Sequence, residues 1–555
     1  CEHGGLNESL AELYARTGDK RWLALAERIR HRRVLDPLSE EKDILDGLHA
    51  NTQIPKLIGL ARLHEVTDNP RHATAARFFW TNVTTERSYV IGGNADRESF
   101  PKARTISKYI TEQTCESCNT YNMMKLTRHL YAWSPDAAYF DYYERAHLNH
   151  ILAQHNPRTG MFSYMVPLMS GAHRDFSSPF DDFWCCVGTG MESHAKHGDS
   201  IYWRGDDHLF VNLYIPSTLA WTERKARFEL KTAYPFSDRI AFEIQELGRK
   251  GAFTIAMRIP AWCATPMLSV NGTPTEIAPV NGYALVRRAW KAGDRLELVL
   301  PMQVRAEPTG DDPDTVALLH GPLVLAADLG PTDQPFDGPA PALVAANVAA
   351  GLRPVGSEPA VFRSDGMGRP GDMNFAPFFQ QYERRTAVYF RRFSEAQWGV
   401  EQTRVAEAQA RQRDLEARSL DVIKLGVEAD EKAHKLASKD SYTGDYRRRG
   451  GRDARTGGYF EFAMKAGPGQ LVLQATYWGD EVRRQFKIMV DGTTVATQHL
   501  DAEAPGTFFD VDYPVPLELT RGKSQVTVRF EPIPEHSAGP VFGCRLFTAG
   551  KAIAA

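Results

Sequence analysis

The stretch Leu63-His-Glu-Val-Thr-Asp-Asn-Pro70 decides how the first part of the chain folds. Apolar residues recur at helical spacing on both sides of it, and its polar second half ends one helix and starts the next. The same arrangement, an apolar and aromatic helix end followed by a polar turn, occurs at Arg16-Thr-Gly-Asp19 and at Ser134-Pro-Asp136. We therefore expect three αα-hairpins between about residues 10 and 154.

Helical hairpins of this kind stack into a solenoid or close into a toroid around a shared core. A closed toroid needs more hairpins than these three, so we expect a partial fold or further helices ahead of Cys1. The chain also begins with Cys1-Glu-His3, without Met and without a visible signal peptide. We expect a native N-terminus ahead of Cys1.

After about Trp203 the apolar period changes to two, and Val270-Asn-Gly272 is a strong hairpin signal. Pro, Gly and Ala are frequent from 331 to 375, and the charged stretch from about 404 to 440 has a helical or disordered composition. We expect a multidomain α + β fold. Its predicted domains are a helical-hairpin domain at 1–203, a β-sandwich at 204–330, a linker and irregular or mixed segment at 331–456, and a C-terminal β-sandwich-like domain at 457–555.

Length and composition exclude several classes of protein. A chain of 555 residues is too long for one core, so we expect about two to four domains. Hydrophobic residues make up 43%, but no apolar run approaches the roughly 20 residues that span a bilayer. Lys and Arg number 66 against 69 Asp and Glu, for a net charge of -3, which leaves no electrostatic footprint for nucleic acid.

The cysteines point to metal or redox chemistry. Seven cysteines are too few for a disulfide framework, and four of them gather in Glu112-Gln-Thr-Cys-Glu-Ser-Cys118 and Phe183-Trp-Cys-Cys-Val-Gly188. From spacing alone, a closed structural zinc site of four cysteines and a functional zinc or thiol site have about equal weight. Glu116 lies between the first two cysteines and could replace one of them as a ligand. A redox role for Cys115 and Cys118 is less favoured, because no βαβ unit surrounds them.

Polar and aromatic residues near glycines are candidate ligand contacts. Glu98 follows the loop Ile91-Gly-Gly-Asn94, although a solvated loop carboxylate is the simpler interpretation of it. His3 and His49 adjoin glycines at the mouths of helical hairpins, where neutral histidine can bond sugar hydroxyls. Individually, each is more typical of a helix end or a core. Tyr164 could stack on a sugar, but core packing is its default.

Four longer strings resemble the β-L-arabinofuranosidases of glycoside hydrolase families 127 and 146. The strings are Glu2-His-Gly-Gly-Leu-Asn-Glu8, Glu116-Ser-Cys-Asn-Thr-Tyr-Asn-Met-Met-Lys-Leu-Thr-Arg128, Tyr142-Tyr-Glu-Arg-Ala-His-Leu-Asn149 and Phe183-Trp-Cys-Cys-Val-Gly-Thr-Gly-Met-Glu-Ser-His194. The resemblance runs from residue 2 to near 330. It implies an (α/α)6-type helical barrel, lacking its N-terminal helices, followed by β-sandwich domains.

The resemblance also implies roles for single residues. The zinc ligands would be Glu116, Cys118, Cys185 and Cys186, with Cys185 also the nucleophile and Glu98 the general acid/base. The sugar-contacting positions would be His3, His49, Glu144 and Tyr164. Cys115 is additional to the family pattern and competes with Glu116 as the fourth ligand. That alternative stays open.

The implied activity is that of a retaining exo-glycosidase that releases β-L-arabinofuranose from plant-derived glycans or glycoproteins. Zn²⁺ is the expected cofactor, and an arabinofuranose-containing glycan is the expected partner, with no nucleic acid, no membrane and a homo-oligomer left open. A hydrolase of a related furanoside, or a non-catalytic glycan-binding protein with a structural zinc site, is the alternative. Enzymes of polymer breakdown are often exported, so we expect a periplasmic or secreted location.

Overall fold

The computed structural model describes residues 4–249, 251–336, 338–447, 449–504 and 506–549. The chain divides into two units, Cys1–Glu395 and Ala396–Ala555. Within the described ranges, no helix combines the length and the apolar character that crossing a membrane requires.

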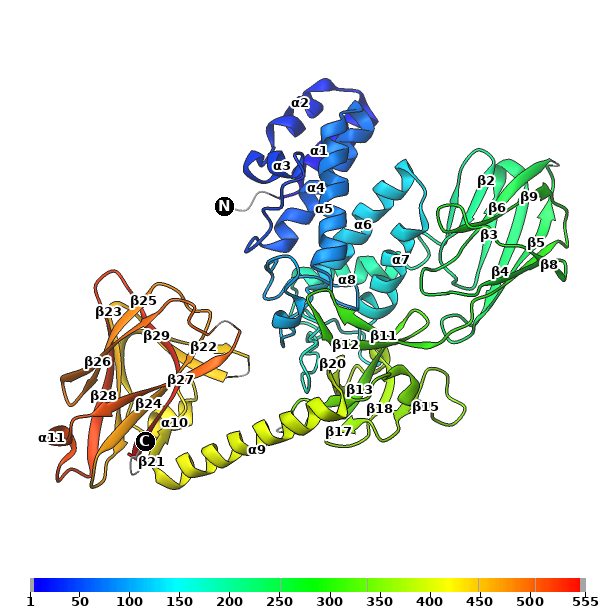
Figure 1. Cartoon of the computed structure of the whole chain (residues 1–555). Helices are drawn as coiled ribbons and strands as arrows, with labels where there is room; N and C mark the ends of the chain where they lie inside the picture. Colours follow the sequence, from blue (N-terminus) through cyan, green and yellow to red (C-terminus); the bar gives the residue numbers. More distant parts are fainter. Residues whose placement is uncertain (1–3, 250, 337, 448, 505, 550–555) are drawn as a thin grey trace. The chain divides into compact units, whose positions relative to one another are not determined.

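The three predicted αα-hairpins are present in the first unit (Figure 1). Their helices are, pair by pair, α1 (Leu6–Thr17) and α2 (Lys20–Arg28), α4 (Ala50–Thr67) and α5 (Pro70–Glu86), and α6 (Ser117–Trp133) and α7 (Ala137–Ala146). The second helix of each pair starts at a capping side chain, Asp19, Asn69 or Asp136, that accepts a hydrogen bond from the backbone N–H two residues later. Four further helical elements complete this part: α3 (Arg32–Leu38), η1 (Ile106–Tyr109), η2 (His147–Ile151) and α8 (Cys185–Ala195).

The helical part is followed by a sandwich of two sheets, one with four strands and one with six. The four-stranded sheet holds, in spatial order, β1 (Tyr202–Arg204), β2 (His208–Val211), β6 (Ala252–Arg258) and β9 (Tyr283–Ala289). The six-stranded sheet holds β3 (Ser217–Trp221), β4 (Ala226–Thr232), β5 (Arg239–Leu247), β10 (Arg295–Val299), β7 (Met267–Val270) and β8 (Thr273–Thr275), with η3 (Thr222–Arg224) after β3. The predicted hairpin turn at Asn271-Gly272 joins β7 to β8.

Two of the expected domain boundaries are wrong. Residues 304 to 393 form a separate ten-stranded sheet, so the sandwich ends before 330 and the stretch from 331 to 393 is not a linker. The strands are β11 (Val304–Thr309), β12 (Asp312–His320), β13 (Leu323–Pro331), β14 (Ala342–Val344), β15 (Leu352–Pro354), β16 (Phe362–Ser364), β17 (Gly368–Arg369), β18 (Asn374–Pro377), β19 (Arg384–Ala387) and β20 (Tyr389–Phe393), with η4 (Ala349–Gly351) and η5 (Phe378–Gln380) between them. Several are only two to four residues long, so the many Pro and Gly residues mark tight turns between short strands.

The second unit is built around a nine-stranded sheet, which also takes in residues that we expected to be linker. Its strands are β21 (Ser419–Ile423), β22 (Ala437–Tyr446), β23 (Arg449–Lys465), β24 (Leu471–Trp478), β25 (Arg484–Val490), β26 (Thr493–Leu500), β27 (Phe508–Val515), β28 (Gln525–Pro532) and β29 (Ala538–Thr548). The helices are α9 (Glu395–Arg418), which leads into this unit, α10 (Glu428–Ala433) and α11 (Leu517–Thr520). The unit has its own core, which includes Phe460, Leu473 and Phe530.

The half-buried carboxylate of Glu65 ties two of the hairpins together. Glu65 of α4 accepts hydrogen bonds from Trp133 of α6 (3.1 Å) and from Arg62 (2.9 Å), and its Oε1 lies 2.7 Å from His129 Nδ1. Burial by itself would raise the pKa of Glu65, but the hydrogen bonds and charge of His129, with those of Arg62 and Trp133, outweigh it and lower the pKa to about 2.

We expect Glu65→Gln to destabilise the first unit by about 2 kcal/mol at pH 7, because a depression of roughly two pKa units is worth about 3 kcal/mol before allowance for partial exposure. The lowered pKa stabilises the folded state fully when the pH is above the pKa of glutamate in the unfolded chain, about 4.3. This stabilisation is lost progressively as the pH falls towards 2, the pKa in the folded state. Urea unfolding at pH 7 and at pH 3 measures this. A difference between wild type and variant that does not shrink at pH 3 would contradict it.

Candidate active site

Four chain segments that lie outside the long helices pair with one another and carry the candidate residues. Ala50 donates its N–H to the Glu98 carbonyl (2.7 Å), and Cys115 donates to the Ala95 carbonyl (3.1 Å). Single β-bridges join His49 to Ser99, Asp96 to Thr114, and Glu116 to Met165. The segments 47–50, 95–100, 113–116 and 163–166 therefore lie side by side, and each brings one candidate side chain to the same place.

Close backbone approach explains the glycines that precede Glu98. A Cβ on Gly93 would lie 2.7 Å from both Cys115 Sγ and His150 Nδ1, so no side chain fits there. After this loop, Ala95, Arg97 and Glu98 all have positive φ angles of 72°, 46° and 65°. Non-glycine residues rarely adopt this conformation, and its clustering is typical of functional sites.

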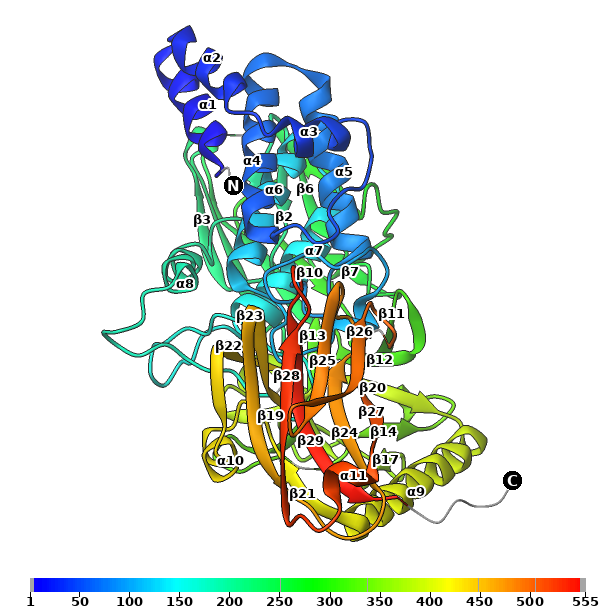
Figure 2. The ribbon, with the colours of Figure 1, turned by 90° about the vertical axis from the view of Figure 1, so that its left-hand side faces the viewer.

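The metal-binding candidates meet where two helices begin. Glu116 is the N-cap of α6, and Cys118 lies in its first turn, while Cys185 and Cys186 are the first two residues of α8. Figure 2 shows α8 next to the long connecting loops that follow α7. The four ligand atoms lie within 4.8 Å of one another, with Cys118 Sγ 3.3 Å from Cys186 Sγ and Cys185 Sγ 3.6 Å from Glu116 Oε1. Helix N-termini favour negative charge, so both ends suit thiolates and a carboxylate.

The cluster has the ligand types of a metal site, and its groups shift one another's pKa values. Burial, with the negative charges of Cys185 and Glu98, raises the pKa of Glu116 to about 8. Hydrogen bonds from Cys118 and Cys186 hold the pKa of the Cys185 thiol well below its usual value, and the pKa of Cys118 is raised by the same contacts and by burial. Of the three thiols in the cluster, Cys185 is the exposed one and the one whose pKa is lowered. Glu116 Oε2 is buried and has no hydrogen-bond partner in the described part of the chain.

Three sulfurs and one carboxylate oxygen at this spacing fit a thiophilic divalent cation. Cys115 does not belong to the group. Its side chain is fully buried against Gly93, and burial raises the pKa of its thiol well above the usual value. The structure thus brings Glu116, and not Cys115, to the other cysteines.

Glu98, His49 and Tyr164 lie at the open side of the cluster. The Tyr164 hydroxyl donates a hydrogen bond to Glu98 Oε1 and lies 3.9 Å from Cys185 Sγ. His49 Nδ1 accepts the Thr52 N–H (3.2 Å), so neutral His49 carries its proton on Nε2, which lies 3.7 Å from Glu98 Oε2. The side chains of Glu98 and His49 are 38% and 37% exposed, so a ligand can reach them. His3 lies outside the described residues.

Glu144 is not at this site. Its carboxylate is buried in an ion pair with Arg258 of β6 (2.5 Å), and Asp141 of α7 binds the same guanidinium (2.6 Å). The pair fastens α7 to the sandwich. Contact of Glu144 with a sugar stays a prediction, and in this structure its carboxylate is engaged by Arg258 of β6.

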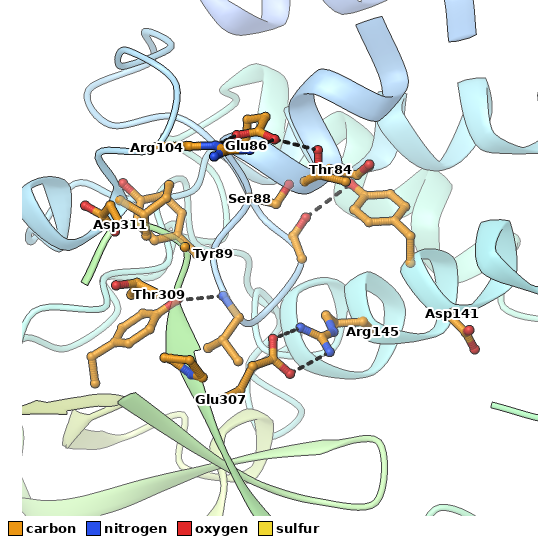
Figure 3. A pocket seen from close by; sticks show the side chains of 18 of the residues that line it. Thr84, Glu86, Ser88, Tyr89, Arg104, Asp141, Arg145, Glu307, Thr309 and Asp311 are labelled. Carbon is orange, nitrogen blue, oxygen red and sulfur yellow. Dashed lines mark hydrogen bonds and ion pairs between the residues drawn. The ribbon is translucent and has the colours of Figure 1, made fainter. Parts of the chain in front are cut away.

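A cavity of about 690 Å³ lies elsewhere in the first unit, lined by α5, α7, β11 and the loop after α5 (Figure 3). Its charged side chains already have partners: Glu86 pairs with Arg104, and Arg145 forms two hydrogen bonds with Glu307. The residues that line it include no cysteine or histidine. Its carboxylates are engaged with partners and it holds no thiol, so the cluster, where an exposed thiol lies near a reachable carboxylate, is the better candidate for a reaction site.

Sequence reasoning missed the polar residues that contact the ligands. Asn51 donates a hydrogen bond from Nδ2 to Glu116 Oε1 (3.1 Å), and Asn122 donates to Asn51 Oδ1 (2.9 Å). Thr189 Oγ1 lies 3.1 Å from Cys118 Sγ. A polar residue in the first turn of a helix is common, and nothing in the sequence links Asn51 to a glutamate 65 positions away.

Family comparisons match most of the first unit. A model described as the catalytic domain of GH127 (glycoside hydrolase family 127) β-L-arabinofuranosidase matches residues 1–199, and that of the GH127 middle domain matches residues 208–302. Residues 414–547 match a family of unknown function, DUF6805.

Individual relatives agree with these matches. A non-reducing end β-L-arabinofuranosidase from Bifidobacterium longum subsp. longum is 24% identical over 392 residues, which cover 60% of this chain and 58% of the relative, less than two thirds of its length. A solved GH127 β-arabinofuranosidase is 22% identical, with a TM-score of 0.56, over 69% of this chain and 68% of the other. A GH127 β-L-arabinofuranosidase from Geobacillus stearothermophilus T6 is 20% identical, with a TM-score of 0.57, over 70% and 72%. At these identities the structural likeness establishes the fold.

We expect Glu144→Gln to destabilise the first unit by about 3 kcal/mol, because it leaves part of the buried Arg258 charge without its partner. The variant should bind a divalent cation to the same extent as the wild type, since the contacts of Glu144 and Arg258 are with α7, the sandwich and each other, and not with the four cluster residues. Urea unfolding and metal analysis after dialysis measure the two effects. Unchanged stability would show that the ion pair does not fasten α7 to the sandwich.

Proposed function

Because this chain belongs to glycoside hydrolase family 127, as the four motifs led us to expect, we propose that it is a retaining exo-glycosidase. It would release β-L-arabinofuranose from the non-reducing ends of plant-derived glycans or glycoproteins. The name of the Bifidobacterium relative supports the sugar and the end that is attacked. A periplasmic or secreted location remains a prediction.

One observation carries the proposal: an exposed thiol and a reachable carboxylate face each other across a single hydroxyl group. Cys185 Sγ lies 3.9 Å from the Tyr164 hydroxyl, which is hydrogen-bonded to Glu98. Retaining glycosidases hold the nucleophile and the acid about 5 to 5.5 Å apart, whereas inverting enzymes need a wider gap for water. Because the Tyr164 hydroxyl contacts both Cys185 Sγ and Glu98 Oε1, these two groups are close enough to support the retaining arrangement.

In the first step, Cys185 Sγ attacks the anomeric carbon and the bond to the leaving oxygen breaks. Glu98 gives its proton to that oxygen, so the aglycone leaves as a neutral alcohol and a thioglycosyl intermediate forms. In the second step, Glu98 takes a proton from water, and the water oxygen replaces sulfur at the anomeric carbon. Two inversions retain the β configuration and return Cys185 to the thiolate and Glu98 to the acid.

Glu116, Cys118, Cys185 and Cys186 would hold Zn²⁺. Bound there, Zn²⁺ would keep the thiols ionised at neutral pH. The buried, unpartnered Glu116 Oε2 supports a cation at this position, since such an atom is costly to leave without a partner.

His49 and Tyr164 would position the acid/base and the sugar. Tyr164 donates a hydrogen bond to Glu98 Oε1, while His49 presents its Nε2 proton towards Glu98 Oε2 from 3.7 Å, beyond hydrogen-bonding distance. Burial and the bond to Glu98 raise the pKa of Tyr164, which keeps its hydroxyl protonated as a donor. When substrate enters, either His49 or Tyr164 can donate a hydrogen bond to a sugar hydroxyl.

We expect Cys185→Ser to lower the turnover of p-nitrophenyl β-L-arabinofuranoside by at least about a thousandfold, because a serine hydroxyl is scarcely ionised at neutral pH. Cys263→Ser, at a buried cysteine outside the cluster, is the matched control and should keep full activity. Circular dichroism checks that both variants fold. Turnover that survives in the serine variant would remove Cys185 as the nucleophile. Folded wild type that binds Zn²⁺ but cleaves no glycoside would favour a glycan-binding protein with a structural metal.

Replacing Glu98 by Gln removes the acid while keeping the size of the side chain. Hydrolysis of an oligosaccharide should fall by about a hundredfold or more, whereas the first step with a 2,4-dinitrophenyl aglycone, which needs no protonation, should fall much less. Pre-steady-state release of the phenol separates that step from the second. Glu383→Gln, at a surface carboxylate paired with Arg158, is the control. Equal losses for both leaving groups would exclude Glu98 as the acid.

A further inference from the structure

The first turn of α4 reaches both halves of the site. His49, its N-cap, faces Glu98, and Asn51, two residues later, donates from Nδ2 to Glu116 Oε1 (3.1 Å). Asn122, on α6 one turn after Cys118, donates in turn to Asn51 Oδ1 (2.9 Å). A chain of two amides thus runs from the body of α6 through α4 and back to the N-cap of α6.

Asn122 determines which way the Asn51 amide points. The two ends of an asparagine amide have the same shape but opposite roles, since oxygen accepts and nitrogen donates. With Asn122 donating to Oδ1, the Asn51 nitrogen is the atom left to face Glu116. Reversing the amide would place two donors against each other at one end and two acceptors against each other at the other.

The Asn51 bond makes the two oxygens of Glu116 unequal. Oε1 is held by Asn51, while Oε2 is buried and has no partner among the described residues. Oε1 also lies 3.6 Å from Cys185 Sγ and 4.0 Å from Cys186 Sγ, so its placement sets the space at the nucleophilic thiol.

We propose that Asn122 and Asn51 are positioning residues that hold Glu116 as a ligand through one carboxylate oxygen. The inference rests on the proposed metal site. Neither asparagine touches the reacting atoms; both act through Glu116. Groups that orient metal ligands in this way typically change the metal affinity 10- to 100-fold when they are removed.

Asn122→Asp separates this role from simpler explanations. Aspartate is almost the same size but can only accept, so the Asn51 amide turns over, donates to the new carboxylate and presents its oxygen to Glu116. Glu116 is then repelled, and Zn²⁺ should bind about tenfold more weakly. A purely electrostatic effect has the opposite sign, because an added negative charge attracts the cation.

The experiment is a double-mutant cycle on the full chain. The affinity for Zn²⁺ is measured by competition with a chromophoric chelator for wild type, Asn122→Asp, Asn51→Ala and the double variant. The visible absorption spectrum of the Co²⁺ forms reports the ligand geometry. Asn51→Ala alone should weaken binding by 10- to 100-fold, and Asn122→Asp should add no further loss once Asn51 is gone. Asn374→Asp, at an exposed position on β18, is the matched control and should leave the affinity unchanged.

Asn122→Asp that binds Zn²⁺ as tightly as the wild type, or more tightly, overturns the proposal. So does an equal loss with and without Asn51, which would show that Asn122 does not act through it. These affinities do not depend on turnover. A wild type that binds Zn²⁺ but hydrolyses no arabinofuranoside would therefore defeat the proposed activity and leave the inference standing, whereas a wild type that binds no Zn²⁺ would overturn both.

Discussion

Backbone pairing among the four segments 47–50, 95–100, 113–116 and 163–166 is the constraint on which the site depends. None of the four is a long strand, and each is anchored where a helix begins or a loop turns. Their mutual hydrogen bonds bring one functional side chain from each to a single place. The positive φ angles at Ala95, Arg97 and Glu98 lie within this paired loop, whose backbone bonds to the neighbouring segments can offset their strain.

The N-termini of α6 and α8 make the cluster favourable for negative charge. Glu116 and Cys118 lie at the start of α6, and Cys185 and Cys186 at the start of α8, so the positive ends of two helix dipoles lie at the ligands. Burying a carboxylate among three thiols is unfavourable without such compensation, which the raised pKa of Glu116 reflects. The four residues could hold a cation, which would balance this charge, and Cys185 is the one member that is exposed.

The sequence predicted those parts of the fold that arise from neighbours along the chain. Each hairpin turn contains a residue that caps the helix after it, Asp19, Asn69 or Asp136. Capping is an interaction between residues close in the sequence, so the sequence alone can predict it. The region 331–393 was mistaken for a linker because its strands are short and pair with distant partners, as β14 does in parallel with β20. The frequency of Pro and Gly indicates how many turns a segment contains, but it does not indicate which short segments between the turns pair into a sheet.

By itself, the sequence determined the helical hairpins, the family and the set of cysteines and carboxylates available for chemistry, because these depend on local pattern and on motif. Only the tertiary structure decided between Cys115 and Glu116 at the cluster, since adjacent residues point to different sides of the chain. The tertiary structure also shows that Glu144 forms an ion pair with Arg258. It shows that Asn51 bonds to Glu116, and that Asn122 bonds to Asn51. Such contacts link residues far apart in the chain, and their geometry is set by how helices and loops pack.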